Sequence, residues 1–163
     1  MADRSPQGFI DEDIKILLER INSNPNYETT SSCSGRIVML KTQKKDKSEW
    51  LFKSHSPVTA EDIIDSLPEG KVWFMQEPMI LHVKCSTLEV ADELIKKANS
   101  AGLKVSGITS VKNILVEIRD TNRIDTILKK DLMSEDYIKL LVEEANKKLL
   151  ETKGRIKRLE MLF

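Results

Sequence analysis

The densest group of residues that could bind a ligand is a run of small polar side chains just before a predicted strand. Its members are Thr29, Thr30, Ser31, Ser32, Cys33, Ser34, Gly35 and Arg36. The hydroxyls can form hydrogen bonds, the backbone at Gly35 can approach an anion closely, and Arg36 can bind a carboxylate or phosphate through parallel hydrogen bonds. The run predicts a ligand-binding loop, although a polar turn that leads into the strand would have the same composition.

Neither of the common nucleotide-binding motifs accompanies this run. The chain contains no Gly-x-x-x-x-Gly-Lys sequence and no Gly-x-Gly-x-x-Gly sequence. A P-loop and a dinucleotide-binding fold of the Rossmann kind are therefore not indicated.

Histidine and cysteine side chains offer a base or, alternatively, ligands for zinc. The chain has 2 of each, namely His55, His82, Cys33 and Cys85. His82 and Cys85 are separated by an odd number of positions in one predicted strand, so their side chains should point to opposite faces and cannot both reach one ion. We expect Cys85 in the core and His82 on the open face, where its ring can accept a proton or form a structural hydrogen bond. We expect no bound metal.

Further polar positions lie at predicted strand entries. Glu77 precedes Pro78, where its carboxylate could bind a substrate amine or cap a turn. Gly107 follows Ser106 inside a β-like run, and a glycine weakens a strand unless a backbone or ligand must come close there. The segment Ser106–Thr109 therefore predicts a second contact loop.

Aromatic and basic side chains could contact a nucleic acid. The aromatic candidates for stacking on a base are Trp50, Trp73, Phe52 and Phe74, of which we expect at least half to lie in the core. The last predicted helix carries Lys147, Lys148, Lys153, Arg155, Lys157 and Arg158. These residues could contact RNA phosphates, or they could form a solvated helix face.

The elements that must position these residues follow from apolar periodicity. Helices are expected over residues 11–23, 59–67 and 87–101, and from Ser134 almost to the end. Strands are expected over 36–42, 49–55, 71–75, 79–85, 104–108, 114–119 and 124–128, with a loop at Gln43–Ser48. The recurring helix-strand-strand order predicts an α+β fold with a mixed or antiparallel sheet and a long C-terminal helix, in a single domain over residues 1–163.

Composition limits the possible partners and the location. Lys plus Arg and Asp plus Glu number 26 each, so any RNA contact must be local rather than driven by net charge. No run approaches the roughly 20 apolar residues of a membrane-spanning helix. The stretch Met1–Ser5 lacks the apolar character of a signal peptide, and 2 cysteines are too few for a disulfide framework. These features predict a cytoplasmic protein with no membrane association.

Several of these segments together resemble one known family. They are Thr29–Ile37, Trp50-Leu51 with His55, Glu77-Pro78 with Leu81–Val83 and Cys85, Ser106–Thr109, and Met133–Ile138. In order and approximate spacing they resemble the tRNA wybutosine-synthesising protein family, third enzyme, and the likeness covers nearly the whole chain. Arg123–Leu132 departs most from the eukaryotic pattern, and the short ends favour the archaeal form.

The resemblance implies an S-adenosylmethionine-dependent methyltransferase. Its substrate would be ring nitrogen N-4 of a tricyclic, 4-demethylwyosine-type guanine derivative beside the anticodon of phenylalanine tRNA; the exact derivative stays open. The residues that it nominates are His82 and His55 as proton acceptors; Ser31, Ser32, Ser34, Gly35, Arg36, Ser106 and Gly107 for the cofactor; and Arg36, Glu77 and Trp50 for the substrate.

Other classes of function remain open from the sequence. The chain has no S-adenosylmethionine fingerprint that we can identify, which favours a non-catalytic tRNA-binding or assembly protein of the same pathway as the alternative. A zinc-dependent enzyme is a third possibility. The oligomeric state is not predicted.

Overall fold

The computed structural model describes residues 10–41 and 49–163. The predicted loop Gln43–Ser48 and the stretch Met1–Ser5 lie outside the described residues. The helices are α1 (Glu12–Ser23), α2 (Ala60–Asp65), α3 (Leu88–Ser100) and α4 (Glu135–Glu160), with a short 3-10 helix at Lys130–Leu132. The strands are β1 (Tyr27–Cys33), β2 (Arg36–Leu40), β3 (Trp50–Ser54), β4 (Lys71–Glu77), β5 (Ile80–Cys85), β6 (Val105–Ser110), β7 (Leu115–Arg119) and β8 (Ile124–Lys129).

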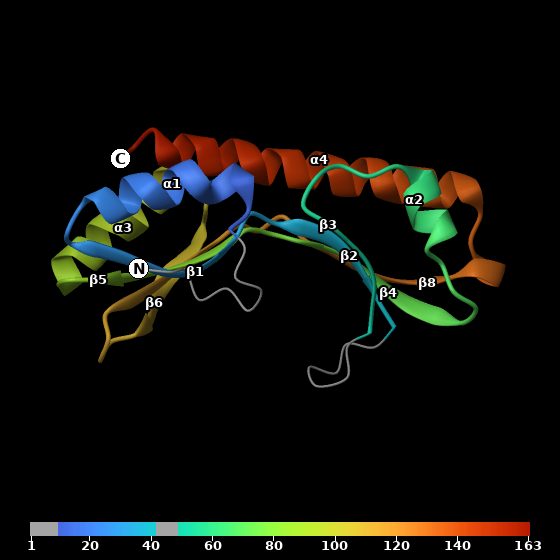
Figure 1. Ribbon diagram of the computed structural model, residues 1–163, viewed down its shortest axis with the longest axis horizontal. Coiled ribbons are helices and arrows are strands. Elements are labelled where there is room, and N and C mark those ends of the chain that lie inside the picture. Colours follow the sequence, from blue (N-terminus) through green and yellow to red (C-terminus); the bar gives the residue numbers. More distant parts are fainter. Residues whose placement is uncertain (1–9, 42–48) are drawn as a thin grey trace. The chain divides into compact units, whose positions relative to one another are not determined.

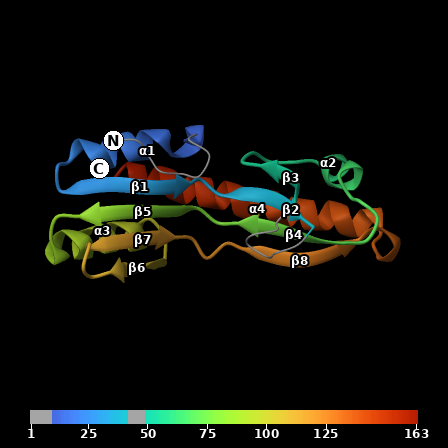
Figure 2. The same ribbon diagram turned by 60° about the horizontal axis from the view of Figure 1, so that its bottom comes forward.

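These strands form two four-stranded sheets, and every strand pair is antiparallel (Figure 2). Sheet A has the order β1-β5-β7-β6, and sheet B has the order β3-β2-β4-β8. The predicted α+β class with antiparallel pairing is confirmed. The chain divides into two compact units: the first comprises the described part of Met1–Ser34 with Pro78–Thr121 and Thr152–Phe163, and the second the described part of Gly35–Glu77 with Asn122–Glu151.

The first unit is built on sheet A. Its helices α1 and α3 lie on the same side of the sheet (Figure 1) and, with the end of α4, enclose one apolar core. The predicted stripe of α1 is fully or almost fully buried there, as are the alternate residues of β5 and β7: Ile14, Leu17, Leu18, Ile21, Leu81, Val83, Val116 and Ile118. Because successive residues of a strand point to opposite faces, the residues between them lie on the other face, which we call the open face of sheet A.

Strand β1 corrects one prediction. The residues Thr29–Cys33 were expected in a loop, but they belong to a strand that pairs with β5 and carries a bulge between Thr29 and Ser31. The prediction was wrong because Thr and Ser can occupy a half-buried edge strand, in which only one face must be apolar. The predicted strand over 104–108 is confirmed as edge strand β6, so Ser106–Thr109 is part of a strand rather than a separate loop, and its role in ligand contact stays a prediction.

The second unit is built on sheet B. Its core contains Ile37, Met39, Phe74 and Leu128 from the sheet, with residues of α2 and of the first part of α4. Thr59 caps α2 as predicted, in a reciprocal pair of hydrogen bonds with Asp62. The other face of sheet B carries Arg36, Glu77, Val38, Met75, Leu40, Trp73 and Trp50, and we call it the open face of sheet B.

The long C-terminal helix is confirmed. The Tyr137 backbone N–H donates to the Ser134 hydroxyl at 3.2 Å, so Ser134 caps the helix start as predicted. The predicted strand over 124–128 is also confirmed as β8, which pairs with β4. Among the described helices, none combines the length and the apolar character needed to cross a membrane.

Candidate active site

A row of polar residues crosses the open face of sheet A. Ser31 in β1 lies directly opposite His82 in β5, His82 lies opposite Glu117 in β7, and Glu117 lies opposite Gly107 in β6. Directly opposed residues of antiparallel strands present their side chains on the same face. The sheet register therefore brings together positions that are far apart in the sequence.

Hydrogen bonds join three members of this row. The Ser31 Oγ lies 2.8 Å from His82 Nδ1, and His82 Nε2 lies 3.0 Å from Glu117 Oε2. The His82 and Glu117 side chains are each 24% exposed, so they are accessible but held between neighbouring strands. The second oxygen of Glu117 lies 3.6 Å from Arg119 Nη1. Such an arrangement of hydroxyl, imidazole and carboxylate can accept a proton from a bound substrate.

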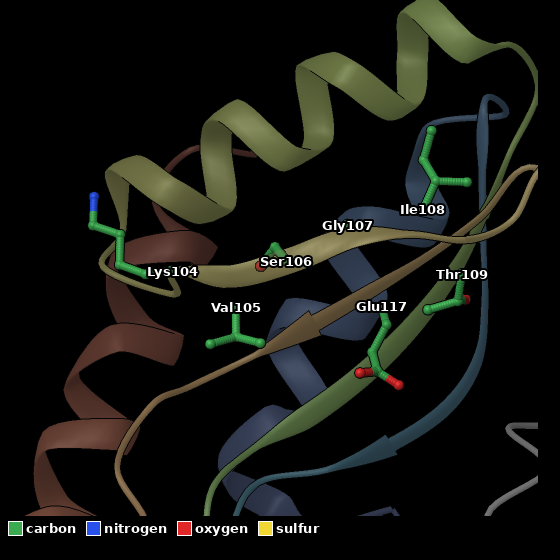
Figure 3. A pocket seen from close by; sticks show the side chains of 7 residues that line it. All are labelled: Lys104, Val105, Ser106, Gly107, Ile108, Thr109 and Glu117. Atoms are coloured by element: carbon green, nitrogen blue, oxygen red, sulfur yellow. The ribbon is translucent and has the colours of Figure 1, made fainter.

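A shallow hollow of about 410 Å³ adjoins this row. It is lined by Lys104, by the β6 residues that follow it as far as Thr109, and by Glu117 (Figure 3). A Cβ atom added to Gly107 would meet no atom within 4 Å, so the missing side chain leaves open space beside the Glu117 carboxylate. Ser106 behaves differently, because it stands opposite buried Ile118 and its hydroxyl donates to the Leu103 carbonyl at 2.9 Å. A cofactor role for the Ser106 side chain stays a prediction.

The open face of sheet B carries a second group of predicted residues. Arg36 lies opposite Glu77, and its Nε donates to the Glu77 carboxylate at 2.5 Å. The guanidinium carbon of Arg36 also lies 4.8 Å from the ring centroid of Trp50, which is 46% exposed. An exposed indole beside a cation offers a stacking surface for a nucleobase.

The remaining aromatic candidates divide differently from the expectation that at least half lie in the core. Phe74 is fully buried, whereas Phe52 is only partly buried and packs against the core of the second unit. Trp73 is partly buried and packs against Val38, Leu40 and Met75 on the open face of sheet B. Trp50 is therefore the most accessible of these rings.

His55 lies in the second unit, where its Nδ1 is 3.0 Å from the Gly35 carbonyl oxygen. Gly35 has a φ of 95°, a conformation that side chains other than glycine rarely adopt. His55 thus contacts the backbone of a glycine with positive φ that directly precedes Arg36 in the chain. Of the other predicted residues, Ser31, Ser32, Ser34, His82, Ser106 and Gly107 belong to the first unit, and Gly35, Arg36, Trp50 and Glu77 to the second.

The expectation that His82 and Cys85 point to opposite faces is confirmed. His82 lies in the polar row, while Cys85 is part of the core of the first unit. Burial raises the pKa of the Cys85 thiol to about 11 and keeps it protonated near neutral pH. These two residues therefore cannot bind one zinc ion.

The basic residues near the end of α4 contact the first unit itself. Lys153 pairs with Asp13, and Arg155 pairs with Asp120, whose side chain is fully buried. Arg158 donates to the Ala101 carbonyl at 3.1 Å, at the end of α3. These three side chains stabilise the packing of α4 in the first unit. Lys153 and Arg155 are largely covered, which differs from the predicted solvated helix face, and a contact with RNA phosphates stays a prediction.

Glu117 is a candidate that the sequence analysis did not identify. The signal was present, because Glu117 alternates with the apolar residues Val116 and Ile118 in a predicted strand. Only the register of β5 and β7 shows that it meets His82.

Comparison with known proteins agrees with the resemblance. The family model described as Methyltransferase TYW3 matches residues 1–163. This chain belongs to the TYW3 methyltransferase family. The predicted family is thereby confirmed over the whole chain.

Relatives in the TYW3 family include curated archaeal proteins. The chain is 41% identical to the tRNA(Phe) 7-((3-amino-3-carboxypropyl)-4-demethylwyosine(37)-N(4))-methyltransferase 1 of Pyrococcus furiosus, over 94% of this chain and 84% of that protein. It is 43% identical to the tRNA(Phe) 7-((3-amino-3-carboxypropyl)-4-demethylwyosine(37)-N(4))-methyltransferase of Thermococcus sibiricus, over 98% of this chain and 87% of that protein. A solved structure, PH1069 from Pyrococcus horikoshii, matches with a TM-score of 0.89 and 39% identity, over 96% of this chain and 87% of that one.

Proposed function

We propose that this protein methylates ring nitrogen N-4 of a 4-demethylwyosine-type guanine derivative beside the anticodon of phenylalanine tRNA. The observation that carries the proposal is the match of the whole chain to a methyltransferase family whose archaeal members, at 41% and 43% identity, are named for this reaction. The substrate in the names of these relatives is a 4-demethylwyosine that carries a 3-amino-3-carboxypropyl group. We propose the same substrate class here.

S-adenosylmethionine is the proposed methyl donor. Its sulfonium methyl would form the new bond to N-4, and the electrons of the methyl–sulfur bond would stay on sulfur. The residues of this chain are compatible with such a molecule, because the Arg36 guanidinium suits its carboxylate. The predicted contacts of Ser31, Ser32, Ser34 and Gly35 remain part of this proposal.

His82 is the proposed proton acceptor. Methylation of N-4 releases the proton that this nitrogen carried, and a positioned base lowers the barrier to that release. His82 meets the requirement because its ring is partly exposed and both ring nitrogens lie within hydrogen-bonding distance of a polar group. His55, which contacts the Gly35 carbonyl, is a candidate for shaping the Arg36 region instead.

The open face of sheet B is the proposed contact for the tRNA anticodon region. The chain carries no net charge, so affinity must come from local contacts rather than a general attraction to phosphate. Trp50 can stack on an unpaired base, while Arg36 and Glu77 offer donors and acceptors next to it. This face would also serve a non-catalytic tRNA-binding protein, which is the second candidate function.

Incubation with labelled S-adenosylmethionine and two tRNAs tests the proposal. One tRNA carries the unmethylated tricyclic base, and the matched control carries an unmodified guanosine at the same position. We expect nucleoside mass analysis to show the gain of one methyl group on the tricyclic base only. Binding of the first tRNA without methyl transfer would support the non-catalytic candidate. The cytoplasmic location, the single functional domain and the absence of a metal remain predictions; metal analysis of the purified protein tests the last.

A further inference from the structure

The pairing of His82 with Glu117 constrains where the ring carries its proton. An ionised carboxylate can only accept hydrogen bonds, so a neutral imidazole that contacts it must present an N–H at that position. The contact is made by His82 Nε2 at 3.0 Å. The proton of the neutral ring is then on Nε2, and Nδ1 is left as the basic nitrogen.

The basic nitrogen faces a hydroxyl. Nδ1 of His82 lies 2.8 Å from the Ser31 Oγ, and a ring nitrogen without a proton accepts the hydrogen bond that this hydroxyl donates. Ser31 therefore donates a hydrogen bond to His82, and His82 donates one to Glu117. The same order of hydroxyl, imidazole and carboxylate activates serine nucleophiles in hydrolases, although there the two ring nitrogens are exchanged.

The surrounding sheet fixes this geometry. On the opposite face, the strand neighbours of His82 and Glu117 are fully buried, namely Leu81, Val83, Val116 and Ile118. Arg119 approaches the second Glu117 oxygen at 3.6 Å, so the carboxylate is held from more than one side. The next row of the same face contains Lys84 and Glu28, which pair with each other at 3.8 Å. Glu28 thus provides a carboxylate on the same face with a different partner.

We propose that Glu117 is the positioning residue for His82 and that the Ser31 hydroxyl passes the substrate proton to it. This inference rests on the proposed function. As the N-4 to methyl bond forms and the methyl–sulfur bond breaks, the N-4 proton moves to Ser31 Oγ, and the Ser31 proton moves to His82 Nδ1. The resulting imidazolium is stabilised by the Glu117 carboxylate until the proton leaves to solvent.

Histidine NMR tests the positioning role without requiring activity. The chain has only 2 histidines, so the nitrogen signals of the His82 ring can be assigned by comparison with a His82→Ala variant. We expect the native protein to show the Nε2–H tautomer at a pH where the ring is neutral. Glu117→Gln replaces the carboxylate by an amide that can donate or accept, so we expect a mixture of tautomers. Glu28→Gln makes the same chemical change on the same face and should leave the spectrum unchanged.

Methyl-transfer kinetics test the catalytic consequence. We expect Glu117→Gln to lower kcat about tenfold, with KM for tRNA within about twofold, because positioning affects the transition state more than substrate binding. Glu117→Asp, which keeps the charge, should recover part of the loss, and Glu28→Gln should match the native enzyme. A Ser31→Ala, Glu117→Gln double variant should lose less than the product of the single losses, because the residues act as one unit.

The outcomes separate this inference from the proposed function. If the native protein fails to methylate the tRNA, the proposed function is wrong, and the NMR result still decides whether Glu117 fixes the tautomer. If the native protein methylates but Glu117→Gln behaves like Glu28→Gln, the positioning role is wrong. A rise in KM at unchanged kcat would also overturn it, because Glu117 would then bind the substrate directly.

Discussion

The open faces of the two sheets differ in kind although both sheets have four antiparallel strands with helices packed on the other face. On sheet A, Ser31, His82 and Glu117 form hydrogen bonds with one another along a single row. On sheet B, the Arg36 guanidinium lies over the exposed ring of Trp50. The first arrangement suits the transfer of a proton, which needs fixed distances, and the second suits contact with a flat ligand, which needs exposed area.

The exposure of Trp50 supports this distinction, whereas the Arg36 and Glu77 side chains, at 29% and 28% exposed, are about as covered as the sheet A pair. His82 and Glu117 are each 24% exposed and bonded on both sides, whereas Trp50 is 46% exposed and has apolar neighbours on its face. Variants on sheet A should therefore lower kcat, and variants on sheet B should weaken binding. An exchange of these two effects between the sheets would contradict this assignment.

The largest effect is expected for His82→Ala. Removing the proposed base should lower kcat about 100-fold, within the usual range for general base catalysis, and leave tRNA affinity within about twofold. Single-turnover methyl transfer at saturating tRNA measures the first quantity, and filter binding measures the second. His55→Ala is the matched comparison: because His55 contacts the Gly35 carbonyl on the second unit, we expect weaker ligand binding and a smaller change in kcat.

An exchange of these results would identify His55 as the base and would reject the assignment of the proton chemistry to sheet A. Full activity in the variant that lacks both histidines would reject histidine as the proton acceptor altogether. Thermal unfolding of each variant controls for loss of structure. His82 is partly exposed, so we expect only a small change in its Tm.

A smaller effect is expected for Trp50→Ala on sheet B. Loss of base stacking should weaken tRNA binding roughly tenfold, in line with about 1–3 kcal/mol per stacked base, while kcat at saturation changes little. Trp50→Phe keeps an aromatic ring and should retain most of the affinity. Ile127→Ala is the control, since Ile127 is 42% exposed on the same face but has no ring. Equal losses for Trp50→Ala and Ile127→Ala would indicate general apolar contact rather than stacking.

The sequence predicted the framework better than the site. Helices α1, α3 and α4 were predictable because their apolar residues recur with helical spacing and their starts carry Ser, Thr or acidic residues. Strand β1 was missed because its Thr and Ser residues need not form an apolar alternation at a sheet edge. Pattern alone also could not divide the eight strands of the described residues between two sheets.

The reason that Glu117 was missed is different. The face of His82 followed from simple alternation in its own strand, and that prediction holds. The partner of His82, in contrast, depends on the register between β5 and β7, which pairs residues 35 positions apart. Register is fixed by long-range packing of Leu81, Val83 and Ile118 in the core rather than by any local motif. The hydroxyl and carboxylate partners of a candidate base can therefore be identified only once the strand register is known from a structure.

The smallest effect is expected for Gly107→Ala. This variant tests how far the site on the open face of sheet A extends over β6. Because the added Cβ would meet nothing within 4 Å, the variant should unfold within about 2 °C of the native Tm, and any shift should be upward, since alanine restricts the unfolded chain. If a ligand enters the hollow beside Glu117, the methyl group should lower kcat/KM about threefold, and Gly107→Val should lower it further. Ser110→Val, in the same strand but outside the lining of the hollow, controls for a change in the strand itself. Unchanged kinetics in both Gly107 variants would confine the reacting groups to the strands β1, β5 and β7, because the space over β6 would then have no part in binding.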